Sequence, residues 1–512
     1  MIDEQLKRIV EAKEAARLIG KIVGTHAEWL YVRAGRASGS LRRGELDFRV
    51  AHARLIFYCV SDTGMEVWRV LGWKWTGEKL LLEAERHAGR DRAPLELIPR
   101  ISARVLASEV AALRRSRCAL LARLACLQLP GAAIERAALS AGASFNQPGN
   151  FARILLSRRS RSRIAVTGIL SEPLPHSVDA LLSTALIWYA RLCETSRRPP
   201  VDKLWVAVEK QCTEALLQRV ALLREGLRRA ISIYEIDEAW RSLSLMPQYE
   251  LEDLFETRPP RLFTHRIGVS ETAARIVELA PDAIDLVRSR HGETLRFHGL
   301  AFARVRRVMN SERVWFGLDP SCRKILDHCS QDEWNKLLGE LKEHRRADAP
   351  SRRHALYKHA PEAWLESLLR RDITRLDPGL RLAPLHAQFR AGQAKAGGSR
   401  PVDLLALRRD GRLTVIELKV SEDREHVMQG ADYWRRIETY RRRGEINRAR
   451  LFDDAEISDD PPLIYLVAPT LRFHRAFHTL ARSLRPAIEL YRLDINEDWR
   501  AGVRVMRRCA LT

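Results

Sequence analysis

The chain of 512 residues, with 46% hydrophobic and 30% charged residues, has a globular composition and is long enough for two large domains or about three of ordinary size. Its 87 Lys and Arg against 65 Asp and Glu leave a formal net charge of +22, which attracts polyanions. An arginine-rich composition that has no polyanionic partner is the alternative explanation of this charge. The eight cysteines form no C-x-x-C pair, and we find neither a secretion signal nor an apolar run that could span a bilayer. We therefore expect a cytoplasmic protein with reduced thiols and no membrane partner.

Two stretches of the chain, 199–241 and 461–500, share an order of features that indicates an internal duplication. In each stretch a Pro-Pro pair precedes a β-like run, a helical segment rich in Arg and Leu, a second strand and a Trp-Arg pair. Upstream, the β-like runs 163–170 and 412–419 correspond at an offset of 249 residues, and each precedes a helix with two adjacent aromatic residues. Strand–helix–strand units resemble one another in general, but the shared order, offset and end residues favour duplication.

The duplication predicts an α/β protein of four segments. Each copy should hold a small β-rich lead segment and an α/β domain. The segments are 1–105 and 106–250 in the first copy, and 251–350 and 351–512 in the second. The basic stretch 345–353, which contains Pro350, is predicted as the linker before the last domain.

The first α/β domain has an arginine-rich hairpin in which serines stand between the basic residues. Such a turn can bind nucleic-acid phosphates, and a solvated basic turn without a ligand is the alternative. The candidate phosphate-binding residues are Arg153, Arg158, Arg159, Arg161 and Arg163.

The last α/β domain has the predicted order helix, strand, hairpin, helix, strand, helix, strand. A proline opens the first helix at 361–370, where leucines recur at helical spacing. The β-rich runs 402–407 and 413–420 flank a turn signal at 409–411. The segment 422–443 is predicted as the next helix.

Glu417 and Lys419 lie two residues apart on the second strand of this hairpin, so they share one face. Apolar neighbours indicate a strand buried on both faces, where charges usually have a function; a surface ion pair on an edge strand is the alternative. A three-residue loop with Gly411 in the left-handed conformation places Asp403 opposite Glu417. A two-residue loop would shift the pairing and send Asp403 to the other face, so clustering of the three charges requires the longer loop.

Asp403 and the run Glu417-Leu418-Lys419 form the D…E-x-K signature of the PD-(D/E)XK, or restriction-endonuclease-like, nuclease superfamily. The string VDLLALRRDGRLTVIELK resembles the C-terminal catalytic domain of NucS-like (EndoMS-like) nucleases. The helix that follows carries a Q-x-x-x-Y pair, as in the RecB-like branch of the superfamily. The resemblance covers little more than the last quarter of the chain.

This resemblance implies a restriction-endonuclease-like αβββαβ domain and a DNA endonuclease that depends on Mg²⁺ or Mn²⁺, in repair or in defence against foreign DNA. Hard divalent cations suit such chemistry because they bind carboxylate and carbonyl oxygens and activate water. The implied catalytic residues are Asp403, Glu417, Lys419, Gln429 and Tyr433. The implied metal ligands are Asp403, Glu417, the backbone carbonyl of Leu418 and, on the first helix, Glu366, with Glu362 one turn earlier as the alternative.

Aligned on these positions, the first copy lacks every catalytic group, since Gly168 stands at the position of Glu417 and Leu170 at that of Lys419. We predict a degenerate copy that positions DNA or completes a dimer-like arrangement. Two other functions stay open at this point: a non-catalytic nucleic-acid-binding or scaffolding protein on a nuclease fold, and an RNA nuclease. The cleavage preference, the protein partners and the oligomeric state are undetermined by the sequence.

Overall fold

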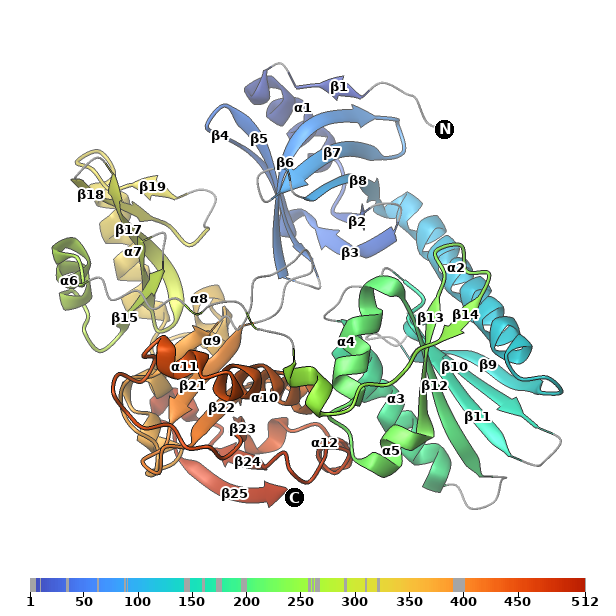
Figure 1. Ribbon diagram of the computed structural model, residues 1–512. Coiled ribbons are helices and arrows are strands. Elements are labelled where there is room, and N and C mark those ends of the chain that lie inside the picture. Colours follow the sequence, from blue (N-terminus) through green and yellow to red (C-terminus); the bar gives the residue numbers. More distant parts are fainter. Residues whose placement is uncertain are drawn as a thin grey trace. The chain divides into compact units, whose positions relative to one another are not determined.

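The computed structural model shows a mixed α/β protein with four β-sheets (Figure 1). It describes residues 6–9, 11–33, 36–61, 64–86, 89, 91–141, 148–158, 162–171, 177–194, 200–256, 259, 262, 268–289, 292–308, 311–319, 323–389 and 401–511. The chain forms two compact units: Met1–Leu127 with Ile134–Ile154 and Ile169–Glu172, and Gln128–Ala133 with Leu155–Gly168 and Pro173–Thr512. In the described part of the chain, no helix is long and apolar enough to cross a membrane.

The first unit contains an eight-stranded sheet in the order β3-β2-β8-β7-β6-β5-β4, with β1 paired to β6. Its strands are β1 (Lys7–Arg8), β2 (Glu28–Arg33), β3 (Arg36–Arg42), β4 (Leu46–Ala51), β5 (Arg54–Ser61), β6 (Gly64–Trp75), β7 (Leu80–Arg86) and β8 (Asp91–Pro99), with helices α1 (Ala12–Gly24) and α2 (Arg100–Leu127). Helix α1 packs on β4 and β5 because Ala12, Ala15, Ile19 and Val23 recur at helical spacing and form one buried face.

The next sheet has the order β14-β13-β12-β11-β10-β9. Its strands are β9 (Ala133–Ala141), β10 (Pro148–Ser157), β11 (Arg163–Gly168), β12 (Val201–Glu209), β13 (Ile231–Ile236) and β14 (Leu243–Leu245). β11, β12 and β13 run parallel, and β14 runs antiparallel to β13. Parallel neighbours need crossover connections, which helices supply: α3 (Ser177–Glu194), then α4 (Lys210–Val220) with α5 (Glu225–Ala230).

The last sheet repeats this arrangement in the order β25-β24-β23-β22-β21-β20. Its strands are β20 (His386–Phe389), β21 (Val402–Leu407), β22 (Leu413–Leu418), β23 (Leu463–Pro469), β24 (Leu490–Ile495) and β25 (Val505–Leu511). β22, β23 and β24 run parallel, and β25 runs antiparallel to β24. The crossover helices are α10 (His426–Arg442), which the short α11 (Glu445–Arg448) follows, and α12 (Phe477–Ala481). The two sheets thus share strand order, as the sequence repeat predicts, and β11–β14 share strand sense with β22–β25.

The predicted elements of the last domain form where the sequence pattern puts them. Helix α9 (Pro361–Arg371), β21 and β22 match the expected helix and hairpin, and α10 begins at His426 rather than at 422. β25 is an additional strand that the pattern did not predict. It is a largely exposed edge strand, so it lacks the apolar alternation by which buried strands are found.

A five-stranded antiparallel sheet, β15-β16-β17-β18-β19, precedes the last domain. Its strands are β15 (Ile284–Ser289), β16 (Gly292–Phe297), β17 (Leu300–Val308), β18 (Ser311–Phe316) and β19 (Lys324–Ile325), with helices α6 (Glu271–Glu278), α7 (Gln331–His344) and α8 (Ala355–Lys358). Gly299 follows β16 at φ +80°, and a Cβ there would lie 1.9 Å from the Ala363 carbonyl of α9. The sheet therefore packs directly on the helix that opens the last domain.

Arg345, at the start of the predicted basic linker 345–353, is packed against neighbouring elements. Its side chain is fully buried at 0% exposure. Its guanidinium donates hydrogen bonds to five backbone carbonyls, those of Phe297, His298, Leu356, His359 and Ala360. A buried guanidinium is stable only when its donors are satisfied. Arg345 therefore connects the end of β16 to the start of α9 through these hydrogen bonds.

Candidate active site

The β21–β22 hairpin brings Asp403 and Glu417 to the same face of the sheet. Leu404 lies opposite Ile416 in the antiparallel register, and Asp403, the preceding residue, accepts a hydrogen bond from the Leu418 amide at 2.9 Å. Beyond the strand ends the Arg408 amide donates to the Arg412 carbonyl at 2.9 Å, so the loop is 409–411 and includes Gly411 at φ +82°. The predicted loop length and register are confirmed.

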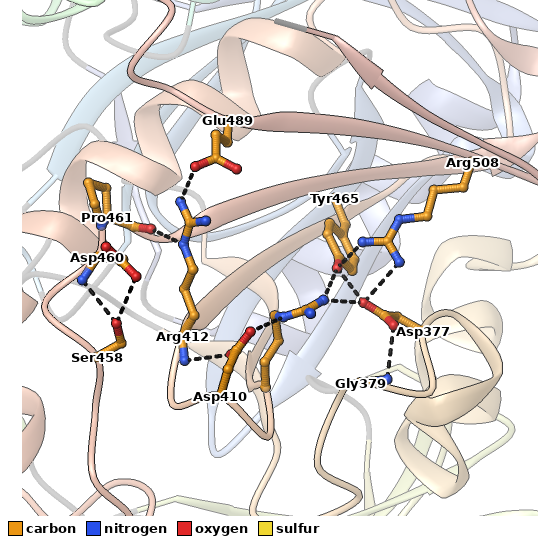
Figure 2. A network of polar contacts seen from close by, with 11 residues as sticks. Asp377, Gly379, Asp410, Arg412, Ser458, Asp460, Pro461, Tyr465, Glu489 and Arg508 are labelled. Atoms are coloured by element: carbon orange, nitrogen blue, oxygen red, sulfur yellow. Dashed lines mark hydrogen bonds and ion pairs between the residues drawn. The ribbon is translucent and has the colours of Figure 1, made fainter.

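A network of polar contacts holds the loop end of this hairpin (Figure 2). Asp377 accepts hydrogen bonds from Arg408 at 2.6 Å and from the Tyr465 hydroxyl at 2.5 Å, and it pairs with Arg508 at 3.1 Å. Tyr465 lies on β23 and Arg508 on β25, so the network ties the hairpin to two further strands of the sheet. Because each of these charges has a partner of opposite sign, the network is structural.

Asp403, Glu417 and Lys419 form a buried cluster at the other end of the hairpin. Lys419 Nζ donates to Glu417 Oε1 at 2.8 Å, and Asp403 Oδ2 accepts a hydrogen bond from the Leu418 amide at 2.9 Å. Glu417 is 2% exposed. Asp423 adds a carboxylate 3.8 Å from Lys419. The structure thus brings together the three charged residues that the sequence predicts.

Burial and mutual repulsion disfavour ionisation of both acids. Burial, followed by the charge of Glu417, raises the pKa of Asp403 well above its usual value. Burial also raises the pKa of Glu417, against the opposing effect of Lys419. Burial alone would lower the pKa of Lys419, but the carboxylates of Glu417, Glu362 and Asp403 outweigh it, and the pKa is raised. A second cation at the cluster would therefore stabilise the ionised acids.

The donor atoms of the cluster fit a hard divalent cation. Mg²⁺ and Mn²⁺ prefer carboxylate and carbonyl oxygens. Glu417 Oε2 is buried and meets no N–H donor among the described residues, and the Asp403 carboxyl lies within hydrogen-bonding range of Glu417, so two acids share the Lys419 ammonium. Over the described ranges, no three Asp, Glu, His or Cys side chains converge closely enough to hold a metal by themselves. A full ligand shell would therefore need backbone, water or substrate oxygens as well, as is common for Mg²⁺.

Two glutamates of α9 lie one turn apart and differ in their partners. Glu366, the first choice from the sequence as a metal ligand, is buried and accepts from Arg296 Nη1 of β16 at 3.3 Å. Glu362 is half-buried, and its charge acts on Glu417 and Lys419. Because Arg296 engages Glu366, Glu362 is the better candidate for a helix ligand.

Tyr433 and Gln429 occupy one face of α10, one turn apart. Tyr433 is buried, and burial together with the charges of Glu417 and Asp403 raises its pKa, which places it within electrostatic range of the cluster. Gln429 is also buried and donates to Glu425 Oε2 at 3.2 Å. Its own Oε1 accepts no hydrogen bond within the described residues, so one amide acceptor is left for a ligand or water.

His426 is a residue of the site that sequence reasoning missed. It is buried at the start of α10, and its Nε2 lies 3.2 Å from the backbone carbonyl of Glu417. Burial, followed by the charge of Lys419, lowers its pKa to about 3, so the ring is neutral at physiological pH. Because a carbonyl only accepts, Nε2 carries the proton and holds the end of β22 in place. No spacing rule in the sequence signals this contact between a helix start and a strand end.

The corresponding place in the first half has no carboxylate. Gly168, at the end of β11, pairs with Ala207 of β12, as Glu417 pairs with Leu466 of β23. Leu170 is a buried apolar residue. The structural equivalents of Glu417 and Lys419 therefore carry no charged side chain.

The arginine-rich hairpin of the first half is less accessible than the sequence suggested. Arg163 is 3% exposed, so its side chain is not available to a phosphate at the surface. Arg153 is half-buried on β10, and Arg158 is exposed. Arg159 and Arg161 lie outside the described residues.

Comparison with known proteins gives one structural likeness. No family model matches the chain, and no curated protein is significantly similar in sequence. A solved structure described as EndoMS in apo form is similar over 41% of this chain and 93% of that chain, with 10% sequence identity and a TM-score of 0.13. At this identity and TM-score the likeness does not decide function.

Proposed function

We propose that the last α/β domain is an endonuclease that hydrolyses phosphodiester bonds in DNA and depends on Mg²⁺ or Mn²⁺. The observation that carries the proposal is the buried cluster of Asp403, Glu417 and Lys419, in which two acids with raised pKa values share one ammonium. Such a cluster opposes folding unless a cation joins it, so it is typical of a functional site and not of a stabilising core. The net charge of +22 suits a polyanionic substrate.

The acids of the cluster would hold the cation. When bound, it would lower the pKa of a coordinated water and offset negative charge on the phosphate. Asp403 and Glu417 supply the first carboxylate oxygens, and Glu362 with the Leu418 carbonyl supplies further donors.

Lys419 and Tyr433 act as proton-bearing groups. The carboxylates around Lys419 raise its pKa, so it stays an ammonium at neutral pH and cannot serve as a general base. It can donate hydrogen bonds to a phosphate oxygen and to the attacking water, which orients both and stabilises developing charge. Tyr433 also keeps its proton, because its pKa is raised, and it can only donate.

We also infer that the two α/β halves arose by duplication and that the first half is a degenerate copy. Their sheets have one strand order, and four consecutive strands, β11–β14 and β22–β25, have one pattern of strand sense. The first half has Gly168 and Leu170 in place of the charged pair, so its contribution is surface and support, not chemistry.

Cleavage assays with the full chain test the proposal. The substrates are supercoiled, linear and single-stranded DNA and RNA, each with Mg²⁺, with Mn²⁺ and with EDTA. We expect metal-dependent cleavage of DNA that falls about 100-fold or more in Asp403→Asn, Glu417→Gln and Lys419→Met, while DNA binding persists.

Asp459→Asn, which removes an exposed acid of the same domain, is the matched control and should cleave at the wild-type rate. A wild-type rate in Glu417→Gln would overturn the assignment. Cleavage of RNA alone would change the substrate class. Binding without cleavage under every condition would indicate a non-catalytic nucleic-acid-binding protein.

A further inference from the structure

A buried arginine of the first half, Arg219, is shared by aspartates of both halves. Its Nε lies 3.0 Å from Oδ1 of Asp179 in α3, and its Nη1 lies 2.8 Å from Oδ1 of Asp432 in α10. Arg219 stands on α4, so the half without the acidic cluster reaches a helix of the half that has it (Figure 1). The side chains of Arg219 and Asp432 are 8% and 1% exposed, so water does not screen the pair.

Asp432 depends on Arg219 for its charge. Burial would raise the pKa of Asp432, but three arginines lower it, and the effect of Arg219 is larger than those of Arg436 and Arg435. Arg435 and Arg436 contact Asp432 from the same helix. If Arg219 were removed, Asp432 would keep a buried charge without its strongest partner, and either the helix would shift or the acid would take up a proton.

The place of Asp432 on α10 connects this pair to the candidate active site. Asp432 immediately precedes Tyr433 and follows Gln429 by three residues. The charges of the acidic cluster act on Tyr433, and Tyr433 in turn acts on Arg219. Any rotation or shift of α10 that moves Asp432 therefore also moves Tyr433, on which the cluster acts, and Gln429, one turn before Tyr433 on the same helix face.

Helix α10 is also confined on its other side. Gly430 packs so closely on β23 that a Cβ there would lie 2.7 Å from Leu466 Cδ2. On the opposite side the helix contacts α3 and α4 of the first half. The helix is thus held between its own sheet and the first half, and Arg219 is the charged contact on the latter side.

We propose that Arg219 is a positioning residue for the active site: the degenerate half holds α10 through the Arg219–Asp432 pair and thereby sets Tyr433 and Gln429 against the acidic cluster. This inference rests on the proposed nuclease function and explains why a half without catalytic groups is retained. Arg219 touches neither substrate nor cation. Its loss should slow turnover and leave substrate binding unchanged.

The test compares Arg219→Gln and Arg219→Lys with Arg485→Gln in the full chain. Arg485 crosses the same junction, donating from Nε to the Ala221 carbonyl at 2.8 Å, but it lies after α12, and the charged partners that the structure describes for it, Glu225 and Glu250, lie outside α10. The readouts are kcat and KM for DNA cleavage, DNA affinity, and hydrogen exchange of the amides in 426–442.

We expect Arg219→Gln to lower kcat about 10- to 100-fold, with KM and affinity within about 2-fold of wild type and with faster exchange in 426–442. Arg219→Lys, which keeps the charge, should recover part of the rate. Arg485→Gln should keep wild-type kcat and wild-type exchange in α10.

A wild-type kcat and unchanged hydrogen exchange in Arg219→Gln would overturn the inference. An equal loss of kcat in Arg485→Gln would also overturn it, because that result would indicate a general loosening of the junction. If Arg219→Gln does not fold, Asp432→Asn, which keeps the side-chain shape, is judged by the same readouts. If the wild type cleaves no substrate, the proposed function fails, but exchange in 426–442 still decides whether Arg219 holds α10.

Discussion

Asp403 and Glu417 differ from the other buried acids of the same domain in their partners. Asp432 and Glu438 are each met by arginines of their own helix, so their charges are compensated. Glu417 pairs with the single ammonium of Lys419, and Asp403 accepts a hydrogen bond from the Leu418 amide and lies within hydrogen-bonding range of Glu417. Each of these structural acids thus pairs with more than one cationic side chain, whereas the two acids of the candidate active site share one. A bound cation would supply the missing positive charge.

Asp403→Asn should stabilise the metal-free protein at neutral pH. The pKa of Asp403 is higher in the folded state than in the unfolded state. Asp403 therefore contributes its full stabilisation at pH values below the unfolded-state pKa. This stabilisation is lost as the pH rises through the folded-state pKa. Asparagine keeps an oxygen for the Leu418 amide but carries no charge. At pH 7 in EDTA we expect the variant's free energy of unfolding to be about 1 kcal/mol higher than that of wild type. Urea denaturation should show the gain shrinking as pH falls toward about 4.

The control for this measurement is Asp459→Asn, which replaces an exposed acid of the same domain and should leave the free energy of unfolding at its wild-type value. Added Mg²⁺ should stabilise the wild type and have little effect on Asp403→Asn, because only binding to the folded state shifts the equilibrium. A variant that is less stable than wild type at pH 7 in EDTA would show that Asp403 is a structural acid.

The β21–β22 hairpin decides whether the acids meet at all. A slip of one residue would send every side chain of β21 to the opposite face and separate Asp403 from Glu417. The three-residue loop fixes the register, and the network around Asp377 fixes the loop end. Precision at the active site therefore depends on residues at the far end of the same element.

Gly411→Ala should weaken this hairpin. Gly411 has φ +82°, and a Cβ there would lie 2.8 Å from the Glu456 carbonyl, so alanine meets both backbone strain and a clash. We expect a loss of about 1–3 kcal/mol in the free energy of unfolding, with reduced cleavage. Gly226→Ala in α5 is the matched control, because nothing lies within 4 Å of its Cβ position, and it should be neutral or gain up to about 1 kcal/mol. Equal stability of the two variants would contradict a strained loop.

The two α/β halves of the molecule have the same strand order but carry different residues at equivalent strand positions. Glu417 and Gly168 end equivalent strands, yet one strand end is acidic and the other has no side chain. The formal net charge of +22 belongs to the whole chain and suits a polyanionic partner. Under the proposed function, cleavage would belong to the half with the acidic cluster, and the other half would contribute binding and support.

Joint replacement of Arg158, Arg159 and Arg161 by Gln should weaken DNA binding and reduce its salt dependence. Each lost phosphate contact should lower the slope of log affinity against log salt by about one unit, while the bound complex turns over at a near-normal rate. Fluorescence anisotropy at several salt concentrations measures the slope.

Arg163→Gln serves as the contrasting variant, since Arg163 is buried and should affect stability but not the slope. An unchanged slope in the triple variant would mean that the first half binds DNA elsewhere or not at all.

The sequence by itself determined the features that depend on near neighbours. Alternation located β21 and β22, the glycine at 411 specified the loop, and the spacing of Glu417 and Lys419 put two charges on one face. The repeat likewise predicted a common strand order. These signals are readable because strand periodicity and turn chemistry act over a few residues.

Only the tertiary structure decided the contacts between residues far apart in the chain. Arg296 engages Glu366 and so favours Glu362 as the ligand, His426 supports the Glu417 carbonyl, and Arg219 joins Asp432 across the two halves. The burial of Arg163 and Arg345 belongs here too, since composition alone would expose both. The physical reason is that burial and ion pairing depend on which surfaces meet after folding, and local spacing carries no information about a partner on another element.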